Sequence, residues 1–390
     1  MAEAAREQYD LVIIGGGPAG LAAGIYGGRA RLKTLILEKD NVGGRAYTTR
    51  EIVNYPSVAE TTGPALMEQM RAHAEKFGVE IRKEAVKSIN VSGEAKLVKT
   101  RRHEYEAQAV IIATGTTARK LGIPGEEEFT GMGVAYCATC DAEFFQDQEV
   151  VVVGSGDQGI EEGLYICKFA SKVTVVVIHD EGILDCNKVA QERAFAEPKM
   201  HFLWNSSLAD IYGGDNVEGV HVKNSKTGEV TDFPCQGVFF FCGMIPETKF
   251  LGDQVPQDER GWLHTGDDMD LGLGGVFAAG DVRQKYLRQV ATAVSDGAAA
   301  ATAAERYISE MNDFRTNVLE SDTPTLLGFW NPEIPGSLDL LNRLREENER
   351  SAEPHKFMEL DVTRKKSLAA KYQVNLTGGQ PAMTVLVGGV

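Results

Sequence analysis

Apolar runs of strand length alternate with helix-length segments along the first 310 residues of the chain. The segment 9–20 begins with a short apolar run, enters a glycine-rich turn and continues as a predicted helix through Ala22 and Tyr26. Residues 33–37 then provide a second strand, which ends at Glu38. This order of strand, glycine turn, helix and strand predicts one βαβ unit of a dinucleotide-binding fold.

The same order of elements returns at residues 149–178, and such self-similarity indicates an internal duplication. Strands with polar ends precede this second unit at residues 109–115 and follow it at residues 275–281. We therefore predict an α/β fold with two Rossmann-like domains of the three-layer ββα type, the first of them discontinuous. The predicted domains are 1–117 with 246–315 as the first dinucleotide-binding domain, 118–245 as the second, and 316–390 as a C-terminal extension.

A long helix is predicted from about residue 287 to residue 311, and the composition changes after it, at residues 316–324. About seventy residues remain, which suffices for a small α/β domain. Strands and helices alternate there, at 325–330, 334–350, 356–362, 364–372 and 382–387.

This last region is similar to a truncated thioredoxin fold. The resemblance rests on Phe329-Trp330 before a helix and on Pro381, which would take the cis-proline position before the last strand. Aligning Phe329-Trp330 with that family places Ile334 and Ser337 where the two cysteines would stand, so the region is predicted to exchange no disulfides. Two uses remain open: a binding or regulatory lid that mimics a thioredoxin partner, or an extension for dimerisation and stability.

The composition is that of an ordinary water-soluble enzyme, with 43% hydrophobic and 25% charged residues. No apolar run approaches the roughly 20 residues that a transmembrane helix needs, and the polar start lacks the apolar core of a secretory signal. The net charge of -16 argues against nucleic-acid binding, because no basic cluster offsets it. We therefore expect a cytoplasmic protein with no membrane and no nucleic-acid partner.

The first glycine turn has the pattern that binds a dinucleotide. Gly15 permits the tight turn, Gly17 lets the backbone approach a pyrophosphate, and Gly20 lets helix and strand pack closely. An anion would then lie at the N-terminus of the helix. Glu38, 18 residues beyond Gly20, is placed to accept hydrogen bonds from ribose hydroxyls.

Two of the six cysteines, Cys137 and Cys140, have the spacing of a redox pair. Such a pair can close a disulfide, and a low thiol pKa makes one sulfur a nucleophile. Half a zinc site is disfavoured, because no second CxxC or HxxxH supplies two more ligands. Asp141 could protonate a departing thiolate, or it could be an exposed loop carboxylate or helix cap. The cysteines expected in the core are Cys167, Cys186, Cys235 and Cys242.

Several short motifs resemble the low-molecular-weight thioredoxin reductases over roughly residues 8 to 310. The most specific of them is Tyr136-Cys-Ala-Thr-Cys-Asp141. The others are the first glycine turn, Gly43-Gly44-Arg45, Asn54-Tyr55-Pro56, Ala113-Thr114-Gly115, the run from Gly275 to Val282 and Arg288-Gln289.

The resemblance implies a homodimer with tightly bound FAD. It implies that Asp281 binds the ribityl or pyrophosphate region, that Gln289 lies near the isoalloxazine ring, that Cys140 faces the flavin and that Cys137 attacks a partner's disulfide. Arg45 departs from the family, which usually has glutamine there. The other positions carried over for FAD are Gly44, Asn54, Thr114, Gly115, Gly280 and Arg288.

The second glycine turn could hold a pyridine nucleotide. The resemblance implies NADPH, but the family's His-Arg-Arg run and later arginine are replaced here by His179-Asp180-Glu181 and Asp185. Carboxylates would repel a 2'-phosphate, whereas Asp180 can accept from a free 2'-hydroxyl. We therefore predict NADH, and the alternative is a degenerate nucleotide domain in a ferredoxin-dependent enzyme. The glycines of this turn are Gly154, Gly156 and Gly159.

The predicted function is the transfer of two electrons from FAD to the Cys137 and Cys140 pair, and from there to a disulfide on thioredoxin or a thioredoxin-like protein. An alternative of another class is a non-catalytic flavoprotein sensor that binds thioredoxin-like partners. The intact cysteine pair argues against the sensor.

Overall fold

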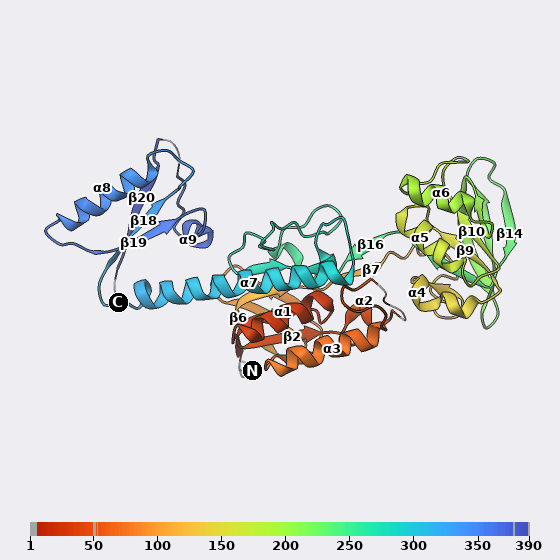
Figure 1. Ribbon diagram of the computed structural model, residues 1–390, viewed down its shortest axis with the longest axis horizontal. Coiled ribbons are helices and arrows are strands. Elements are labelled where there is room, and N and C mark those ends of the chain that lie inside the picture. The colour runs from red at the N-terminus through yellow and green to blue at the C-terminus, as the bar shows by residue number, and fades with distance from the viewer. Residues whose placement is uncertain (1–5, 50–51, 53, 377–378, 389–390) are drawn as a thin grey trace.

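The computed structural model describes residues 6–49, 52, 54–376 and 379–388. Three bodies follow one another along the molecule, and helix α7 (Val290–Phe314) runs along the central body toward the C-terminal one (Figure 1). Both larger bodies have parallel strands with helices packed on them, so the predicted α/β class is confirmed. In the described ranges no helix has both the length and the apolar character that crossing a membrane requires.

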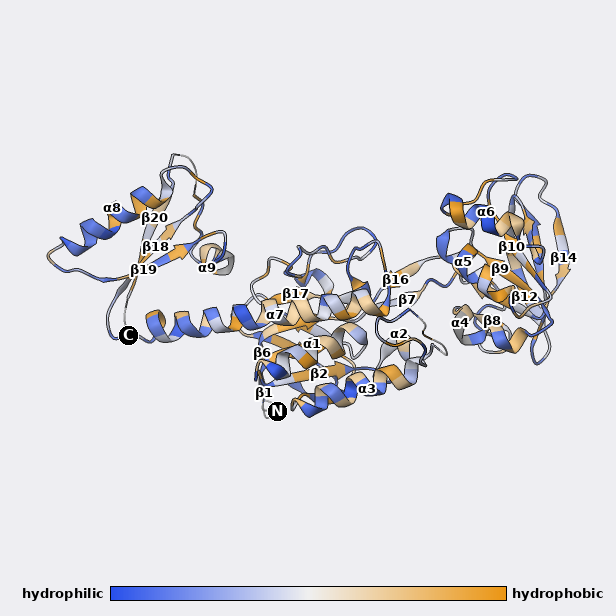
Figure 2. Ribbon diagram, viewed as in Figure 1, coloured by the Kyte–Doolittle hydropathy of each residue, from blue (hydrophilic) through white to orange (hydrophobic). Residues whose placement is uncertain are grey.

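The central body is built on a seven-stranded sheet. Five strands are parallel, and their inner positions are apolar because both faces of the sheet are covered. Figure 2 shows the hydrophobic character of β1 and β2. The order is β3 (Glu80–Lys83), β2 (Thr34–Glu38), β1 (Glu7–Ile14), β6 (Glu104–Ile112), β5 (Lys96–Lys99) and β4 (Ser88–Asn90), with β17 (Val276–Ala278) paired to the end of β6.

Three helices pack on one face of this sheet, namely α1 (Pro18–Arg29), α3 (Gly63–Lys76) and α7. Small residues let α1 and α7 approach closely: a Cβ on Gly297 of α7 would lie 2.1 Å from the carbonyl oxygen of Ala19 on α1. The close packing fixes the start of α1, which carries the glycine turn, against the start of α7.

The second body has a five-stranded parallel sheet and a three-stranded antiparallel sheet. The parallel order is β11 (Met200–Leu203), β10 (Lys172–Val176), β9 (Glu149–Val153), β15 (Gly237–Phe240) and β8 (Val134–Ala135). The antiparallel sheet holds β12 (Ser206–Gly213), β13 (Val217–Asn224) and β14 (Val230–Pro234). Helices α4 (Ala138–Asp141), α5 (Asp157–Ile166) and α6 (Lys188–Ala196) complete this body.

The chain passes between these two bodies twice, through a pair of short antiparallel strands, β7 (Thr116–Ala118) and β16 (Met244–Pro246). Each has three residues, and Thr116 faces Pro246 while Ala118 faces Met244. Figure 1 shows β7 and β16 between the central body and the second body.

The C-terminal body is a three-stranded sheet in the order β19 (Lys356–Asp361), β18 (Thr325–Trp330) and β20 (Ala382–Val387), with helices α8 (Ser337–Glu349) and α9 (Lys366–Lys371). Its core includes Phe314 at the end of α7 and Val318 of the π-helical turn after it (Arg315–Leu319), packed with Leu327 and Phe329 of β18. This body is therefore built onto α7. Figure 1 places it at the opposite end of the molecule from α4, so it does not lie over the cysteine turn of its own chain.

Two expectations for this body were wrong. The described residues contain no cis peptide bond, so the bond before Pro381 is trans. Helix α8 begins at Ser337, three residues later than predicted, because Gly336 before it adopts a left-handed conformation with φ of 77°. The Ser337 hydroxyl accepts from the N–H of Asn331 at 2.8 Å and donates to the carbonyl of Pro381. A buried, hydrogen-bonded hydroxyl therefore stands where the resemblance places the second cysteine.

Candidate functional site

The turn between β1 and α1 brings the chain so close to itself that two glycines leave no room for a side chain. Gly15 has φ of +108°, and a Cβ there would lie 2.3 Å from the carbonyl oxygen of Ala113. A Cβ on Gly20 would lie 1.8 Å from the carbonyl oxygen of Gly15. At Gly17 the nearest atom to such a Cβ is 4.0 Å away. Gly17 is the N-cap of α1 and no side chain caps that end, so its N–H groups are available to an anion.

Glu38 ends β2 beside this turn and is buried. One carboxylate oxygen accepts from the N–H of Gly16 at 2.7 Å, and the other accepts from the N–H of Asp40 at 2.9 Å. These bonds hold the turn and fix the carboxylate in place. Each oxygen can accept a further hydrogen bond, as from a ribose hydroxyl.

The structure brings several of the sequence-predicted FAD residues together around this turn. The N–H of Gly43, next to Gly44, donates to the carbonyl of Gly16 at 2.7 Å. The side chain of Asn54 donates to that of Gln289 at 3.1 Å, although 235 residues separate them. The Thr114 hydroxyl donates to the carbonyl of Glu247 at 2.8 Å, and the N–H of Glu247 donates to the carbonyl of Gly115 at 3.0 Å.

Asp281 follows β17 and has one carboxylate oxygen, Oδ1, that is buried and has no hydrogen-bond partner. Burial raises its pKa, and the nearby cations Lys285, Arg288 and Arg45 act in the opposite direction. A buried acceptor without a donor is costly. A ligand hydroxyl would satisfy it, so this atom and the open side of Gly17 fit the ribityl and pyrophosphate parts of FAD.

The loop that carries Asp281 is anchored by Asp296, a residue that the sequence did not indicate. Asp296 lies on α7, is buried, and accepts from the N–H of Gly280 at 3.0 Å. It also pairs with Arg283 at 2.9 Å and with Lys285 at 2.7 Å. Arg288 stacks over the Trp262 ring, 4.0 Å from its centre. In the sequence Asp296 gives no signal, because it is one of four acidic residues in a long alanine-rich helix.

Cys137 is disulfide-bonded and stands at the N-cap of the short helix α4. Its carbonyl accepts from the N–H of Asp141 at 3.2 Å, which closes the turn. The side chain of Cys140 lies outside the described residues. Of the other cysteines, Cys167 and Cys235 are buried, and burial raises the pKa of each thiol to about 12. These two are therefore neutral thiols at pH 7.

Cys186 and Cys242, also expected in the core, are only partly buried and pack at the edges of two hydrophobic clusters. Both are free thiols, and burial raises the pKa of each, that of Cys242 to about 11. Both thiols are therefore poorer nucleophiles than an ordinary cysteine.

The residue before Cys137 is held by a buried carboxylate that the sequence also left unnoticed. Glu126 accepts from the hydroxyl of Tyr136 at 2.8 Å and from the N–H groups of Leu121 and Gly122 at 3.1 and 2.6 Å. The Tyr136 ring stacks on Phe240 of β15. These contacts fix the position of the residue that precedes the cysteine turn.

The second glycine turn repeats the geometry of the first. Gly154 has φ of +123°, and a Cβ there would lie 2.5 Å from the carbonyl oxygen of Phe241. A Cβ on Gly159 would lie 2.1 Å from the carbonyl oxygen of Gly154, while nothing lies within 4 Å of one on Gly156. Gly156 is the uncapped N-cap of α5. This turn could therefore accept a pyrophosphate in the same way.

Two of the three acidic residues beside the second turn have partners. Asp180 pairs with Lys226, a partner that the sequence did not reveal, and this pairing lowers the Asp180 pKa. Asp185 interacts with the His179 ring at 2.8 Å and accepts from the Ser155 hydroxyl at 3.2 Å. The local charge is thus less negative than three carboxylates suggest, because Lys226 compensates one of them.

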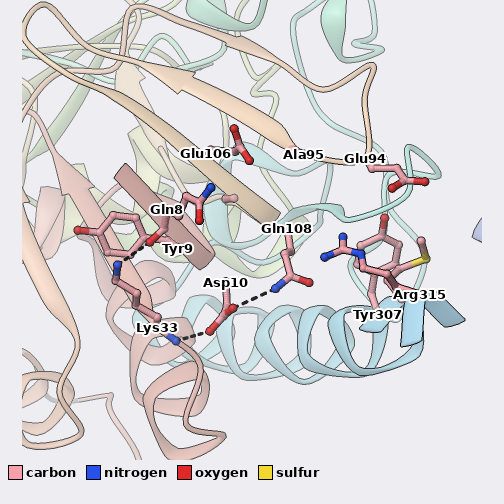
Figure 3. A pocket seen from close by; sticks show the side chains of 12 residues that line it. Gln8, Tyr9, Asp10, Lys33, Glu94, Ala95, Glu106, Gln108, Tyr307 and Arg315 are labelled. Atoms are coloured by element: carbon pink, nitrogen blue, oxygen red, sulfur yellow. Dashed lines mark hydrogen bonds between the residues drawn. The ribbon is translucent and has the colours of Figure 1, made fainter. Parts of the chain in front are cut away.

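A separate pocket of about 410 Å³ lies near the start of β1, at the end of the central sheet away from the glycine turn (Figure 3). It is lined by Asp10 near the start of β1, by Lys33 before β2 and by Tyr307 and Arg315 at the end of the long helix. The glycine turn follows the other end of β1. The pocket is therefore not part of the dinucleotide site.

A model of the family described as pyridine nucleotide-disulphide oxidoreductase matches residues 9–297. The thioredoxin reductase of Peptoclostridium acidaminophilum is 48% identical over 307 residues, which cover 77% of this chain and 97% of that protein. The thioredoxin reductase of Bacillus subtilis strain 168 is 42% identical over 306 residues, which cover 78% of this chain and 96% of that protein.

Two solved structures extend this similarity to the fold. Thioredoxin reductase of Lactococcus lactis, in a form named the FR conformation, matches with a TM-score of 0.69 and 44% identity, over 77% of this chain and 99% of that one. Thioredoxin reductase of T. acidophilum matches with a TM-score of 0.67 and 32% identity, over 78% and 100%. The C-terminal body lies beyond the residues that the family model matches.

The different surroundings of Gly17 and Gly20 predict different effects of a methyl group. Gly17→Ala has room in the fold but occupies the approach of a pyrophosphate, so it should weaken FAD binding on the order of tenfold, about 1.4 kcal/mol, with unchanged apoprotein stability. Gly20→Ala meets backbone and should destabilise the apoprotein itself. Flavin retention and thermal unfolding of the apoproteins measure both effects. Full flavin affinity in Gly17→Ala would contradict this assignment.

Proposed function

Because the chain belongs to the pyridine nucleotide-disulphide oxidoreductase family, and so to flavin-dependent oxidoreductases, we propose that it reduces a disulfide of thioredoxin or a thioredoxin-like protein. The observation that carries the proposal is the disulfide-bonded Cys137 at the start of α4, in the body that β7 and β16 connect to the glycine turn of the central body. The names of the relatives support thioredoxin as the partner.

FAD, when bound, supplies a carrier that takes two electrons from a donor and passes them to a disulfide. Gly15, Gly17 and Gly20 would hold its pyrophosphate, and Glu38 and Asp281 would accept from its hydroxyls. We propose that Cys137 and Cys140 form the redox pair. Once reduced, the Cys137 thiolate attacks the partner's disulfide and one partner thiolate departs. Cys140 then attacks the mixed disulfide, which releases the second thiolate and restores the pair.

Each departing thiolate needs a proton, and Asp141 is proposed as the group that supplies it. It is the last residue of α4, one position beyond Cys140. Replacement by asparagine keeps the size of the side chain but removes the carboxyl group that can give up a proton. Asp141→Asn should therefore slow turnover and change the pH–rate profile of disulfide reduction. A profile that coincides with that of the parent would remove this role.

The proposed donor is NADH. The second turn has the shape that accepts a pyrophosphate, and Asp180 follows β10, where an acidic residue accepts from a ribose 2'-hydroxyl. No arginine stands in the run His179-Asp180-Glu181 to grip a 2'-phosphate. Among the described residues, Lys226 is the one lysine or arginine that forms an ion pair with this segment, and its partner is Asp180. A homodimer in the cytoplasm remains part of the proposal.

The Asp180 and Lys226 pair gives a test of donor choice. Asp180→Ala should raise the KM for NADH about tenfold by loss of one charged hydrogen bond, and it should free Lys226 to bind a 2'-phosphate, so that NADPH improves as a donor. Lys226→Ala in the Asp180→Ala background should remove that gain.

The measurement is the rate of flavin bleaching after anaerobic mixing with NADH, NADPH or reduced ferredoxin. Fast bleaching of the parent by NADPH at low concentration would contradict NADH selectivity, and bleaching by ferredoxin alone would favour the ferredoxin-dependent alternative.

A further inference from the structure

The two glycine turns belong to repeated units, but the strand that follows each turn ends differently. In the central body β1 and β2 end in register at Ile14 and Leu37, and the next residue of β2 is Glu38. In the second body β9 and β10 end in register in the same way, and the residue after β10 is Val177. Val177 is fully buried in the hydrophobic core of that body. The end of β10 therefore supplies no carboxylate to the second turn.

Asp185 supplies a carboxylate to the second turn from the loop after β10. Its N–H donates to the carbonyl of Ser155 at 3.0 Å, and its Oδ2 accepts from the Ser155 hydroxyl at 3.2 Å. Ser155 is the second residue of its turn, as Gly16 is of the first, and Gly16 is the residue that donates to Glu38. Asp185 therefore contacts the second turn at the position equivalent to the one that Glu38 contacts in the first.

Further hydrogen bonds hold the loop along the turn and fix the Asp185 carboxylate. The N–H and the side-chain amide of Asn187 donate to Oδ1 of Asp157, the first residue of α5, at 2.6 and 2.8 Å. The His179 ring contacts Oδ2 of Asp185 at 2.8 Å. Both side-chain contacts of Asp185 use Oδ2, so its Oδ1 has no partner among the described residues, and the side chain is 56% exposed. Oδ1 is therefore open to a ligand.

Asp180, the other acidic residue of this loop with a partner, is placed differently. Its carboxylate pairs with Lys226, which lies in the turn between β13 and β14. Among the described residues no hydrogen bond joins the Asp180 side chain to the second glycine turn. Of these two carboxylates, that of Asp185 is the one fixed to the turn.

We propose that Asp185 is a specificity-determining residue of the second site, where it accepts a hydrogen bond from an adenosine ribose hydroxyl of the nucleotide, as Glu38 does in the site proposed for FAD. The proposal rests on the function proposed above, in which this turn binds NADH. A carboxylate accepts hydrogen bonds and carries a negative charge, so it binds a free hydroxyl and repels a phosphate at the same place. Asp185 and Asp180 act together, because one ribose offers two hydroxyls.

The test measures the binding of two probes to the flavin-bound protein by isothermal titration calorimetry. ADP has the diphosphate and both ribose hydroxyls, whereas 2',3'-dideoxyadenosine diphosphate lacks the hydroxyls. Asp185→Ala should weaken ADP binding about tenfold, because a charge-assisted hydrogen bond is lost, and it should leave binding of the dideoxy probe near that of the parent. Glu181→Ala is the matched control from the same loop, and it should leave the affinity for both probes near that of the parent.

Equal weakening of both probes in Asp185→Ala would overturn the proposal, because the residue would then only hold the loop in place. Tighter binding of both would also overturn it, because Asp185 would then act by repelling the diphosphate. Flavin bleaching by NADH tests the proposed function separately. If the two probes differ as expected but NADH does not bleach the flavin, the proposed donor is wrong and the role of Asp185 stands. A parent that binds neither ADP nor NADH would overturn both.

Discussion

The contact between Gly20 and the backbone of Gly15 is the constraint on which the site depends. Because helix α1 starts within contact distance of the end of β1, its first N–H groups are held at one point beside Glu38 and the loop after β17. Gly159 and Gly154 repeat the contact in the second body. Two glycine turns of the same close geometry therefore exist in one chain. The cysteine turn belongs to the second body. Its helix, α4, packs against α5, the helix that starts at the second glycine turn.

Much of the fold could be read from short-range patterns. The strands at residues 325–330 and 382–387 have the predicted bounds, and the two βαβ units appear where apolar runs and glycines place them. These elements are local, so neighbouring residues determine them. The start of α8 was missed because Gly336 adopts a left-handed conformation that no periodicity reveals. The antiparallel strands β12 to β14 were not predicted, because their apolar positions are interrupted by polar and charged residues that face solvent.

The candidate site was predictable only as a set of types and spacings. Glycine, CxxC and a terminal acidic residue carry their chemistry in the sequence, so they could be named. Asp296, Glu126 and Lys226 each bind residues outside their own helix or loop, and a single charged residue in the sequence gives no sign of such a partner. Lys226 matters most among them, because it changes the charge that the donor would meet at Asp180.

The central claim is that Cys137 delivers electrons to a partner's disulfide while Cys140 resolves the product. It is tested most directly by mixing the reduced Cys140→Ser protein with oxidised thioredoxin and measuring the mass and attachment site of any covalent adduct. The account predicts a stable one-to-one mixed disulfide through Cys137, because the residue that would resolve it is gone. Absence of an adduct, or attachment through Cys186 or Cys242 instead, would contradict the account.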